Sequence, residues 1–240
     1  MSLMQRSKSL GRINTANRQK ILDCAEELFA LSGYDGVSVR AITSRAGVDV
    51  SQVNYYFGTK DALFEEVMLR RADRMSQARM RSISSLNLTG DISGDRSKLN
   101  RKILTFFINP LFGDSPKERG ELSNYRKLIA LVANSKRWQD SVFKEHYDPI
   151  VESYIDALCL VNSHLSRDDV CWAFNFFLGS LTNAIAETGR IDRLSRGSVQ
   201  SSDLDLMIDR LIDFAAGAFA GMSLNINQEL KNDDGRVCDG

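Results

Sequence analysis

Apolar side chains recur along this chain at the spacing of an α-helix. Ile21, Ala25 and Phe29 are each four residues apart, so they fall on one helical face. Gly33 follows this pattern and can end the helix. Strict alternation of apolar and polar residues, which marks a half-buried strand, is not found over any length of the sequence. The pattern therefore predicts an all-α fold.

Two short helices joined by a tight turn are predicted to come next. Ser38 can cap the first of them, and Gly47 can end it. Asp49 starts the second, and Gln52 three positions later fits a capping box with it. A glycine turn between two short amphipathic helices is typical of a helix-turn-helix pair. Thr59 is then expected to cap a fourth helix, which runs to about residue 80.

The rest of the chain predicts a larger helical body. Residues 82–98 are rich in Ser, Gly, Asp and Asn, and this change of composition separates the N-terminal helices from the later ones. Further helices are expected over 99–111, 122–133, 138–147, 150–161, 168–188 and 203–222. We divide the chain into a flexible basic arm, a helix-turn-helix domain, a helical domain and a polar tail, with bounds 1–14, 15–60, 61–224 and 225–240.

Charge is balanced overall but uneven along the chain. The 31 basic and 31 acidic residues give a formal net charge of zero, so no global field attracts a polyanion. However, the five basic residues nearest the start all precede the first acidic one: Arg6, Lys8, Arg12, Arg18 and Lys20, followed by Asp23. Such a segment is either a solvated tail or an arm that binds a polyanion, and only its context decides between them.

Several classes of chemistry lack support in the sequence. The four cysteines are widely spaced and form no CxxC pair, which argues against a zinc site or a disulfide framework and favours a reducing cytosol. The two histidines, His146 and His164, lie in no recognisable nucleophile or metal motif, and no phosphate-binding glycine loop follows a strand. No apolar run reaches the roughly 18 residues of a membrane span. We therefore expect neither an enzyme nor a cofactor, a metal site or a membrane segment, and we expect a cytoplasmic location.

The segment from Ile42 to Leu63, ITSRAGVDVSQVNYYFGTKDAL, resembles the signature of the TetR family of bacterial repressors. The similarity extends back over AEELFALSGYDGVSVRAI and covers about the first quarter of the chain. The resemblance implies double-stranded operator DNA as a partner, which the second helix of the pair would enter by the major groove. The basic arm could then lie along the DNA or enter the minor groove.

The outer residues of that second helix are the expected groove contacts. Ser51, Gln52 and Asn54 are the candidates to read bases, since Asn and Gln can pair with adenine through two hydrogen bonds. Tyr55 and Tyr56 match family positions that contact the phosphate backbone and the groove wall. Tyrosines at helical spacing are often core residues, but an inward face is already supplied by other side chains of this helix. Many family members carry a different residue at Asn54, which leaves the base preference open.

Neighbouring residues complete the expected contact set. By resemblance, Lys60 binds a phosphate beside the N-terminus of the fourth helix. Arg40 and Thr43 on the preceding helix could reach phosphates or a guanine edge. Ser38 and Val50, which begin the two helices of the pair, are included as flanking contacts.

The resemblance also implies that the helical domain binds a ligand and dimerises. The helices 168–188 and 203–222 are expected to pair with those of a second subunit, which makes a homodimer. The segments RKLIALVANSKRW, HYDPIVESYIDAL and WAFNFFLGSL are similar to the PsrA-type subgroup, which responds to fatty acyl compounds. The candidate ligand contacts are Phe106, Arg126, Trp138, His146, Trp172 and Phe176. Each of these also fits an ordinary structural role.

Together these patterns predict a ligand-responsive, sequence-specific transcriptional regulator. We expect a repressor that a small apolar or acyl effector releases from a palindromic operator. The alternative is a helical activator, or an adaptor without a small-molecule inducer. Catalysis by paired carboxylates is also disfavoured, because the acidic pairs are adjacent in sequence and therefore point in different directions around a helix. These pairs are Glu26-Glu27, Glu65-Glu66 and Asp168-Asp169.

Overall fold

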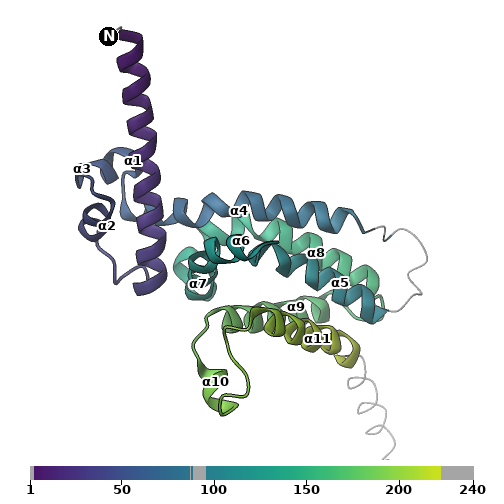
Figure 1. Ribbon diagram of the computed structural model, residues 1–240. Coiled ribbons are helices and arrows are strands. Elements are labelled where there is room, and N and C mark those ends of the chain that lie inside the picture. Colours follow the sequence, from purple (N-terminus) through teal and green to yellow (C-terminus); the bar gives the residue numbers. More distant parts are fainter. Residues whose placement is uncertain (1–2, 87, 89–95, 223–240) are drawn as a thin grey trace, which may run out of the picture. The chain divides into compact units, whose positions relative to one another are not determined.

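The computed structural model describes residues 3–86, 88 and 96–222, and it describes the positions of side chains from residue 15 onward. Every regular element within these ranges is a helix, which confirms the all-α prediction (Figure 1). The chain forms two compact units. The first contains the chain up to Ser76 together with Leu111–Asp148, and the second contains Gln77–Pro110 and the chain from Pro149 onward. Helix α4 (Lys60–Ser84) contributes residues to both units.

The first unit is built on a long N-terminal helix. This helix, α1 (Leu3–Ser32), packs against α2 (Val39–Ala46), α3 (Ser51–Phe57) and α7 (Ser123–Val132). Its predicted apolar face is buried, since Ile21, Ala25 and Phe29 are each fully inaccessible to solvent. Burial of these side chains stabilises the unit, because it removes apolar surface from water.

The N-terminal segment differs from its prediction. Residues 3–14 continue α1 as helix, whereas the sequence predicted a flexible arm over 1–14. The physical reason is that no proline occurs before Pro110, and Leu, Met, Gln, Lys and Arg are good helix formers. A helix already nucleated further along extends through such residues at little cost.

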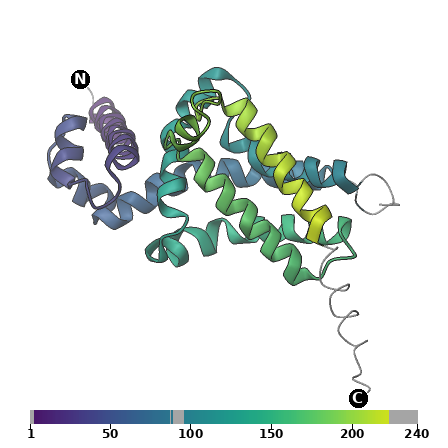
Figure 2. The same ribbon diagram turned by 90° about the horizontal axis from the view of Figure 1, so that it is seen from below.

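The second unit packs five further helices or parts of helices. They are α5 (Arg96–Ile108), α8 (Asp148–Val161), α9 (Arg167–Ile185), α10 (Arg190–Leu194) and α11 (Leu204–Gly221). Helix α11 packs on both α5 and α9, and Figure 2 shows α9 and α11 side by side. An aromatic cluster lies in the core, where the ring centre of Phe107 is 5.1–6.0 Å from those of Tyr154, Phe174 and Phe177.

Several short elements of the described residues differ from the prediction. Helix α6 (Pro116–Glu121) lies in a segment expected to be a connector, and α10 lies between two predicted helices. Both are too short to show a helical period. The segment predicted as one helix over 138–147 is a 3-10 turn, Lys136–Trp138, followed by a π-helix, Gln139–Lys144. The apolar spacing of 3-10 and π-helices is close to that of an α-helix, so the hydrophobic pattern alone does not distinguish the three.

The compact units also divide the chain differently from the predicted domains. The segment Leu111–Asp148, which the sequence assigned to the helical domain 61–224, packs with the N-terminal helices. The predicted polar tail 225–240 lies outside the described residues. No helix within the described ranges combines the length and apolar character that crossing a bilayer requires.

Candidate functional site

The turn between α2 and α3 holds the two helices as a helix-turn-helix pair. Gly47 ends α2 with a φ of 66°, a left-handed conformation that other residues adopt only with strain. The N–H of Val48 donates to the Thr43 carbonyl (3.0 Å), which satisfies the end of α2. On the inner side, Ile42 of α2 and Val53 of α3 are at most 2% exposed. The buried contact therefore fixes which side of α3 faces outward.

The start of α3 is stabilised differently from the prediction. Asp49 Oδ1 accepts hydrogen bonds from the N–H (2.8 Å) and the hydroxyl (2.5 Å) of Ser51, and these bonds lower the pKa of Asp49. The predicted capping box of Asp49 with Gln52 is wrong. Within the part of the chain that the structure describes, Gln52 Oε1 is buried without a hydrogen-bond donor.

The outward side of α3 carries the predicted groove residues. Ser51 and Asn54 are exposed, and the Tyr55 side chain is 73% exposed. Tyr56 is half-buried, and its ring centre lies 5.0 Å from that of Tyr55. Val50 at the start of α3 is exposed as well. Because these side chains do not pack in the core, this side of α3 can enter a DNA groove without any loss of core packing.

Helix α2 and its cap expose two of the three predicted contact residues. Ser38 is exposed and caps α2 by accepting a hydrogen bond from the Ala41 N–H (3.1 Å), as predicted. Arg40 is exposed and could reach a phosphate. Thr43 is 1% exposed, and its hydroxyl donates to the carbonyls of Val39 and Arg40 (3.1 and 3.2 Å). We therefore remove Thr43 from the contact set, because its side chain faces inward and its donor is used within the helix.

Lys60 lies at the N-terminus of α4, where the helix dipole favours an anion. Thr59 caps this helix through its hydroxyl, which accepts a hydrogen bond from the Ala62 N–H (3.1 Å). Lys60 Nζ donates to the Tyr34 carbonyl (2.6 Å) and lies 4.0 Å from the centre of the Tyr34 ring. These contacts therefore fix the position of the Lys60 ammonium in the protein without DNA.

Tyr34 belongs to a charged cluster that sequence reasoning missed. Its hydroxyl donates to Asp61, while Arg137 Nη2 lies 2.9 Å from both carboxylate oxygens of Asp61. Hydrogen bonds from Tyr34 and Arg137 lower the pKa of Asp61. Desolvation and the Asp61 carboxylate raise the pKa of Tyr34 to about 12. No sequence signal identified Arg137, which is 76 residues from Asp61.

A second charged cluster joins α1 to α4. The Glu26 side chain is 3% exposed and accepts hydrogen bonds from Arg70 Nε (2.9 Å) and Arg71 Nη2 (3.1 Å). Arg70 also pairs with Asp23 (2.8 Å). These pairs orient α4 against α1 and so fix the helix whose N-terminus carries Lys60.

Two of the predicted ligand contacts in the first unit, Arg126 and Trp138, are buried and contact residues of that unit. Trp138 is 4% exposed and packs on Phe64 and Tyr34, with ring centres 4.5 and 5.1 Å apart. Arg126 is buried, and its Nη1 donates to the carbonyls of Leu111 and Arg119, both at 3.2 Å. Both have structural contacts, and their part in ligand binding stays a prediction. His146 is half-buried, and its backbone carbonyl accepts a hydrogen bond from Ser76 (3.5 Å).

The predicted ligand contacts in the second unit are half-buried or exposed. Phe106 is half-buried beside Lys102, whose Nζ lies 5.7 Å from the ring centre. Trp172 and Phe176 are 58% and 59% exposed, and their rings lie 5.6 Å apart on the outer side of α9. Their one-turn spacing on α9 explains why they lie together. Phe214 on α11 is also 66% exposed, so both helices present aromatic side chains to solvent.

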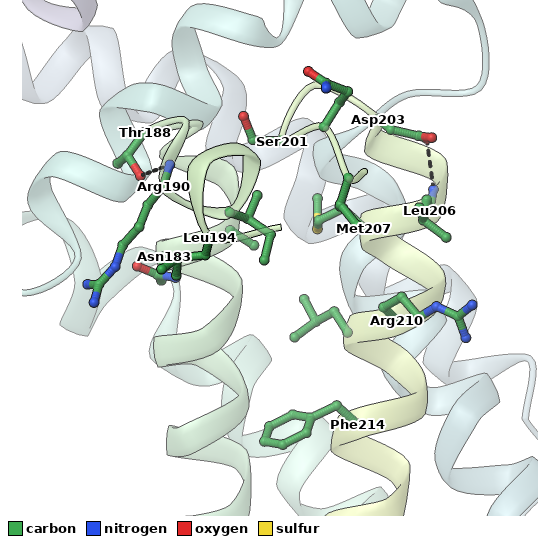
Figure 3. Close-up of a pocket in the computed structure, with 15 residues that line it drawn as sticks. Asn183, Thr188, Arg190, Leu194, Ser201, Asp203, Leu206, Met207, Arg210 and Phe214 are labelled. Carbon is green, nitrogen blue, oxygen red and sulfur yellow. Dashed lines mark hydrogen bonds between the residues drawn. The ribbon is translucent and has the colours of Figure 1, made fainter. Parts of the chain in front are cut away.

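A groove lies where α9 ends and α11 begins, with α10 between them (Figure 3). Its volume is about 690 Å³, within the range of small-molecule sites. In Figure 3, Phe214 points from α11 toward α9, whereas Arg210 points away from α9. The wall combines apolar and polar side chains, among them Ile191, Leu194, Val199, Leu206, Met207 and Leu211 with Asn183, Thr188 and Ser201. None of the six predicted ligand contacts lines this groove.

Two family models and two relatives match parts of this chain. The family model of bacterial regulatory proteins of the tetR family matches residues 21–67, and that of the tetracyclin repressor-like C-terminal domain matches residues 105–218. The HTH-type transcriptional regulator YttP of Bacillus subtilis is 36% identical over 56 residues, which are 23% of this chain and 27% of YttP. The HTH-type transcriptional repressor AcnR of Corynebacterium glutamicum is 34% identical over 71 residues, or 30% of this chain and 38% of AcnR. These matches therefore span well under half of either relative.

Solved structures share the fold over most of the chain. A TetR-family transcriptional regulator from Mesorhizobium loti has a TM-score of 0.52 at 19% identity, covering 87% of this chain and 97% of its own. The fatty acid degradation regulator FadR from Bacillus halodurans has a TM-score of 0.52 at 16% identity, covering 84% of this chain and 95% of its own.

Helices α2 and α3, joined by the turn at Gly47, define a helix-turn-helix protein. Both family models match in chain order and together cover about two thirds of the sequence. The chain belongs to the TetR family, a family of bacterial transcriptional regulators. Within the described residues, no three His, Cys, Asp or Glu side chains come together in a way that could hold a metal ion.

Proposed function

We propose that this protein is a ligand-responsive repressor that binds a palindromic operator as a homodimer. The observation that carries the proposal is the outward side of α3, where Ser51, Asn54 and Tyr55 are exposed behind a buried inner side. Asn54 is the candidate base reader, and Tyr55 is the candidate contact with the groove wall. Arg40 and Lys60 would fix the position of the protein through phosphates.

The aromatic side chains of α9 and α11 support a dimer. Trp172, Phe176 and Phe214 are each more than half exposed, and exposed apolar side chains that gather on one face favour an interaction surface. Gly179 and Gly217 are exposed on the same two helices, and an added Cβ at either would meet nothing within 4 Å. A second copy could therefore approach closely and complete a four-helix bundle around a two-fold axis.

The groove bordered by α10 is the candidate effector site. Its apolar wall suits an elongated apolar or acyl ligand, and the polar side chains at its edge could bind a head group. The fold shared with FadR, a fatty acid degradation regulator, is compatible with this ligand class. Phe214 borders the groove and also belongs to the proposed dimer face, so a ligand there could act on the dimer.

Release would follow from a difference in effector affinity between two arrangements of the dimer. Two copies of α3 must lie about 34 Å apart, one DNA turn, to enter successive major grooves. An effector that binds better to a dimer with another spacing lowers operator affinity in proportion to that preference. An effector that binds both arrangements equally would leave the operator bound.

Fluorescence anisotropy with palindromic fragments from the promoter region of the gene itself tests this function. We expect binding at low salt and release on adding long-chain fatty acids or their coenzyme A thioesters. Absence of binding to every fragment would contradict the DNA-binding function. Binding without release by any acyl probe would favour the alternative, an activator or adaptor without a small-molecule inducer.

A further inference from the structure

Lys60 is held by a residue outside its own helix. Its Nζ donates to the Tyr34 carbonyl (2.6 Å) and lies 4.0 Å from the Tyr34 ring centre. An ammonium has three N–H donors, so the bond to Tyr34 leaves two for a phosphate. A lysine side chain that is already held in place loses less conformational entropy on binding than a mobile, solvent-exposed lysine. The position of Tyr34 therefore decides where the Lys60 charge lies.

Tyr34 is in turn fixed by aromatic contacts and by a carboxylate. Its ring centre lies 5.9 Å from that of Phe29, 5.3 Å from that of Phe64 and 5.1 Å from that of Trp138. Its hydroxyl donates to Asp61, the residue after Lys60. The loop after α1 and the first turn of α4 are thus joined through one side chain.

Arg137 completes this arrangement from the segment after α7. Its Nη2 lies 2.9 Å from both oxygens of Asp61 and 3.3 Å from the Tyr34 hydroxyl, and its guanidinium carbon lies 4.4 Å from the Tyr34 ring centre. The next residue, Trp138, is buried against Phe64, which fixes the backbone that carries Arg137. Arg137 lies in the residues matched by the C-terminal family model, outside the N-terminal match that contains Lys60.

We propose that Arg137 is a positioning residue for operator binding, which holds Tyr34 and Asp61 so that Lys60 can grip a phosphate. The inference rests on the proposed function. Asp61 is a negative charge one residue from Lys60, where it would repel a phosphate and attract the ammonium. Pairing Asp61 with Arg137 offsets both effects. The loss of Arg137 would leave this carboxylate to compete with DNA for Lys60.

The slope of operator affinity against salt concentration tests this coupling. Loss of one phosphate contact reduces the magnitude of the negative slope of log K against log salt by about 0.9. We expect this decrease, with a severalfold loss of affinity, in both Lys60→Ala and Arg137→Gln. The double variant should bind like Lys60→Ala alone, since the two residues act on one contact. Arg137→Lys should restore part of the slope, because it returns a positive charge to Asp61.

Arg167→Gln is the matched control. Arg167 forms a similarly exposed pair with Asp156 (2.6 Å) in the second unit, and its loss should leave the slope unchanged. A loss of affinity in Arg137→Gln with an unchanged slope, or additive effects in the double variant, would overturn the inference.

Chemical labelling of the free protein provides a test that does not depend on DNA. Acetylation of each lysine by acetic anhydride is followed by mass spectrometry, with the exposed Lys20 as the internal reference. Labelling of Lys60 should fall severalfold in Arg137→Gln relative to wild type, because the unpaired Asp61 carboxylate then holds the Lys60 ammonium. Unchanged labelling would overturn the inference even if operator binding is normal. Failure of the wild type to bind any operator contradicts the proposed function instead.

Discussion

At the scale of single residues, exposure on α3 separates the side chains that hold the fold from those that can meet DNA. Val53 and Phe57 are buried, whereas Asn54 and Tyr55 between them are exposed. A substitution on the outer side should therefore change recognition without changing stability.

The substitution Asn54→Ala should cost about 1–3 kcal/mol in operator binding and relax the preference at one base pair, because Asn reads an adenine edge through two hydrogen bonds. Anisotropy titrations against operators carrying each base at each position would measure the change. Thermal unfolding should match the wild type. An unchanged base preference at all positions would show that Asn54 does not read the DNA.

The substitution Glu26→Ala should lower the free energy of unfolding by about 3 kcal/mol, because it leaves Arg70 and Arg71 without their buried carboxylate. Urea denaturation measures this loss. Glu27→Ala is the matched control, since Glu27 is 44% exposed in its pair with Arg45 and should cost less than about 1 kcal/mol. Equal losses in the two variants would contradict the role given to burial.

At the scale of elements, long amphipathic helices could be predicted from the sequence and short or irregular ones could not. Helices α7, α9 and α11 begin and end within a few residues of their predicted bounds. Helix α10 has five residues, too few for a period, and the π-helix after Trp138 follows the same apolar spacing as an α-helix. The capping box was expected at Asp49, but one forms at Ser166 and Asp169.

The turn between α2 and α3 depends on a left-handed glycine. Gly47→Ala should destabilise the protein by about 1–2 kcal/mol, because φ is 66° there although the space around it is open. Urea denaturation would measure this loss. Gly120→Ala is the control, since Gly120 lies in α6 with ordinary φ and open space and should be neutral or slightly stabilising. A neutral Gly47→Ala would show that the turn tolerates other conformations.

At the scale of the whole molecule, the candidate site combines parts that the sequence could and could not identify. The local motif predicted the outer side of α3 and the place of Lys60. It could not identify Arg137, because a contact across 76 residues has no local pattern. Thr43 was included wrongly for a related reason, since a short helix has too few residues to fix its inward side from sequence alone.

The proposed dimer face predicts one change in assembly. Phe214→Asp should convert the dimer to a monomer, because it places a charge in an apolar interface, and size-exclusion chromatography with light scattering would show the change of mass. Leu131→Asp is the control: Leu131 on α7 is 54% exposed and lies outside the proposed face, so this variant should remain dimeric. A dimeric Phe214→Asp would place the interface elsewhere.

The central claim is that two copies of α3 enter successive major grooves of a symmetric operator. Hydroxyl-radical footprinting of the promoter fragment tests it most directly. We expect two protected patches related by two-fold symmetry, with centres about 10 base pairs or a multiple of one helical turn apart, and we expect both to be lost in Tyr55→Ala. A single asymmetric patch, or full protection with Tyr55→Ala, would contradict it.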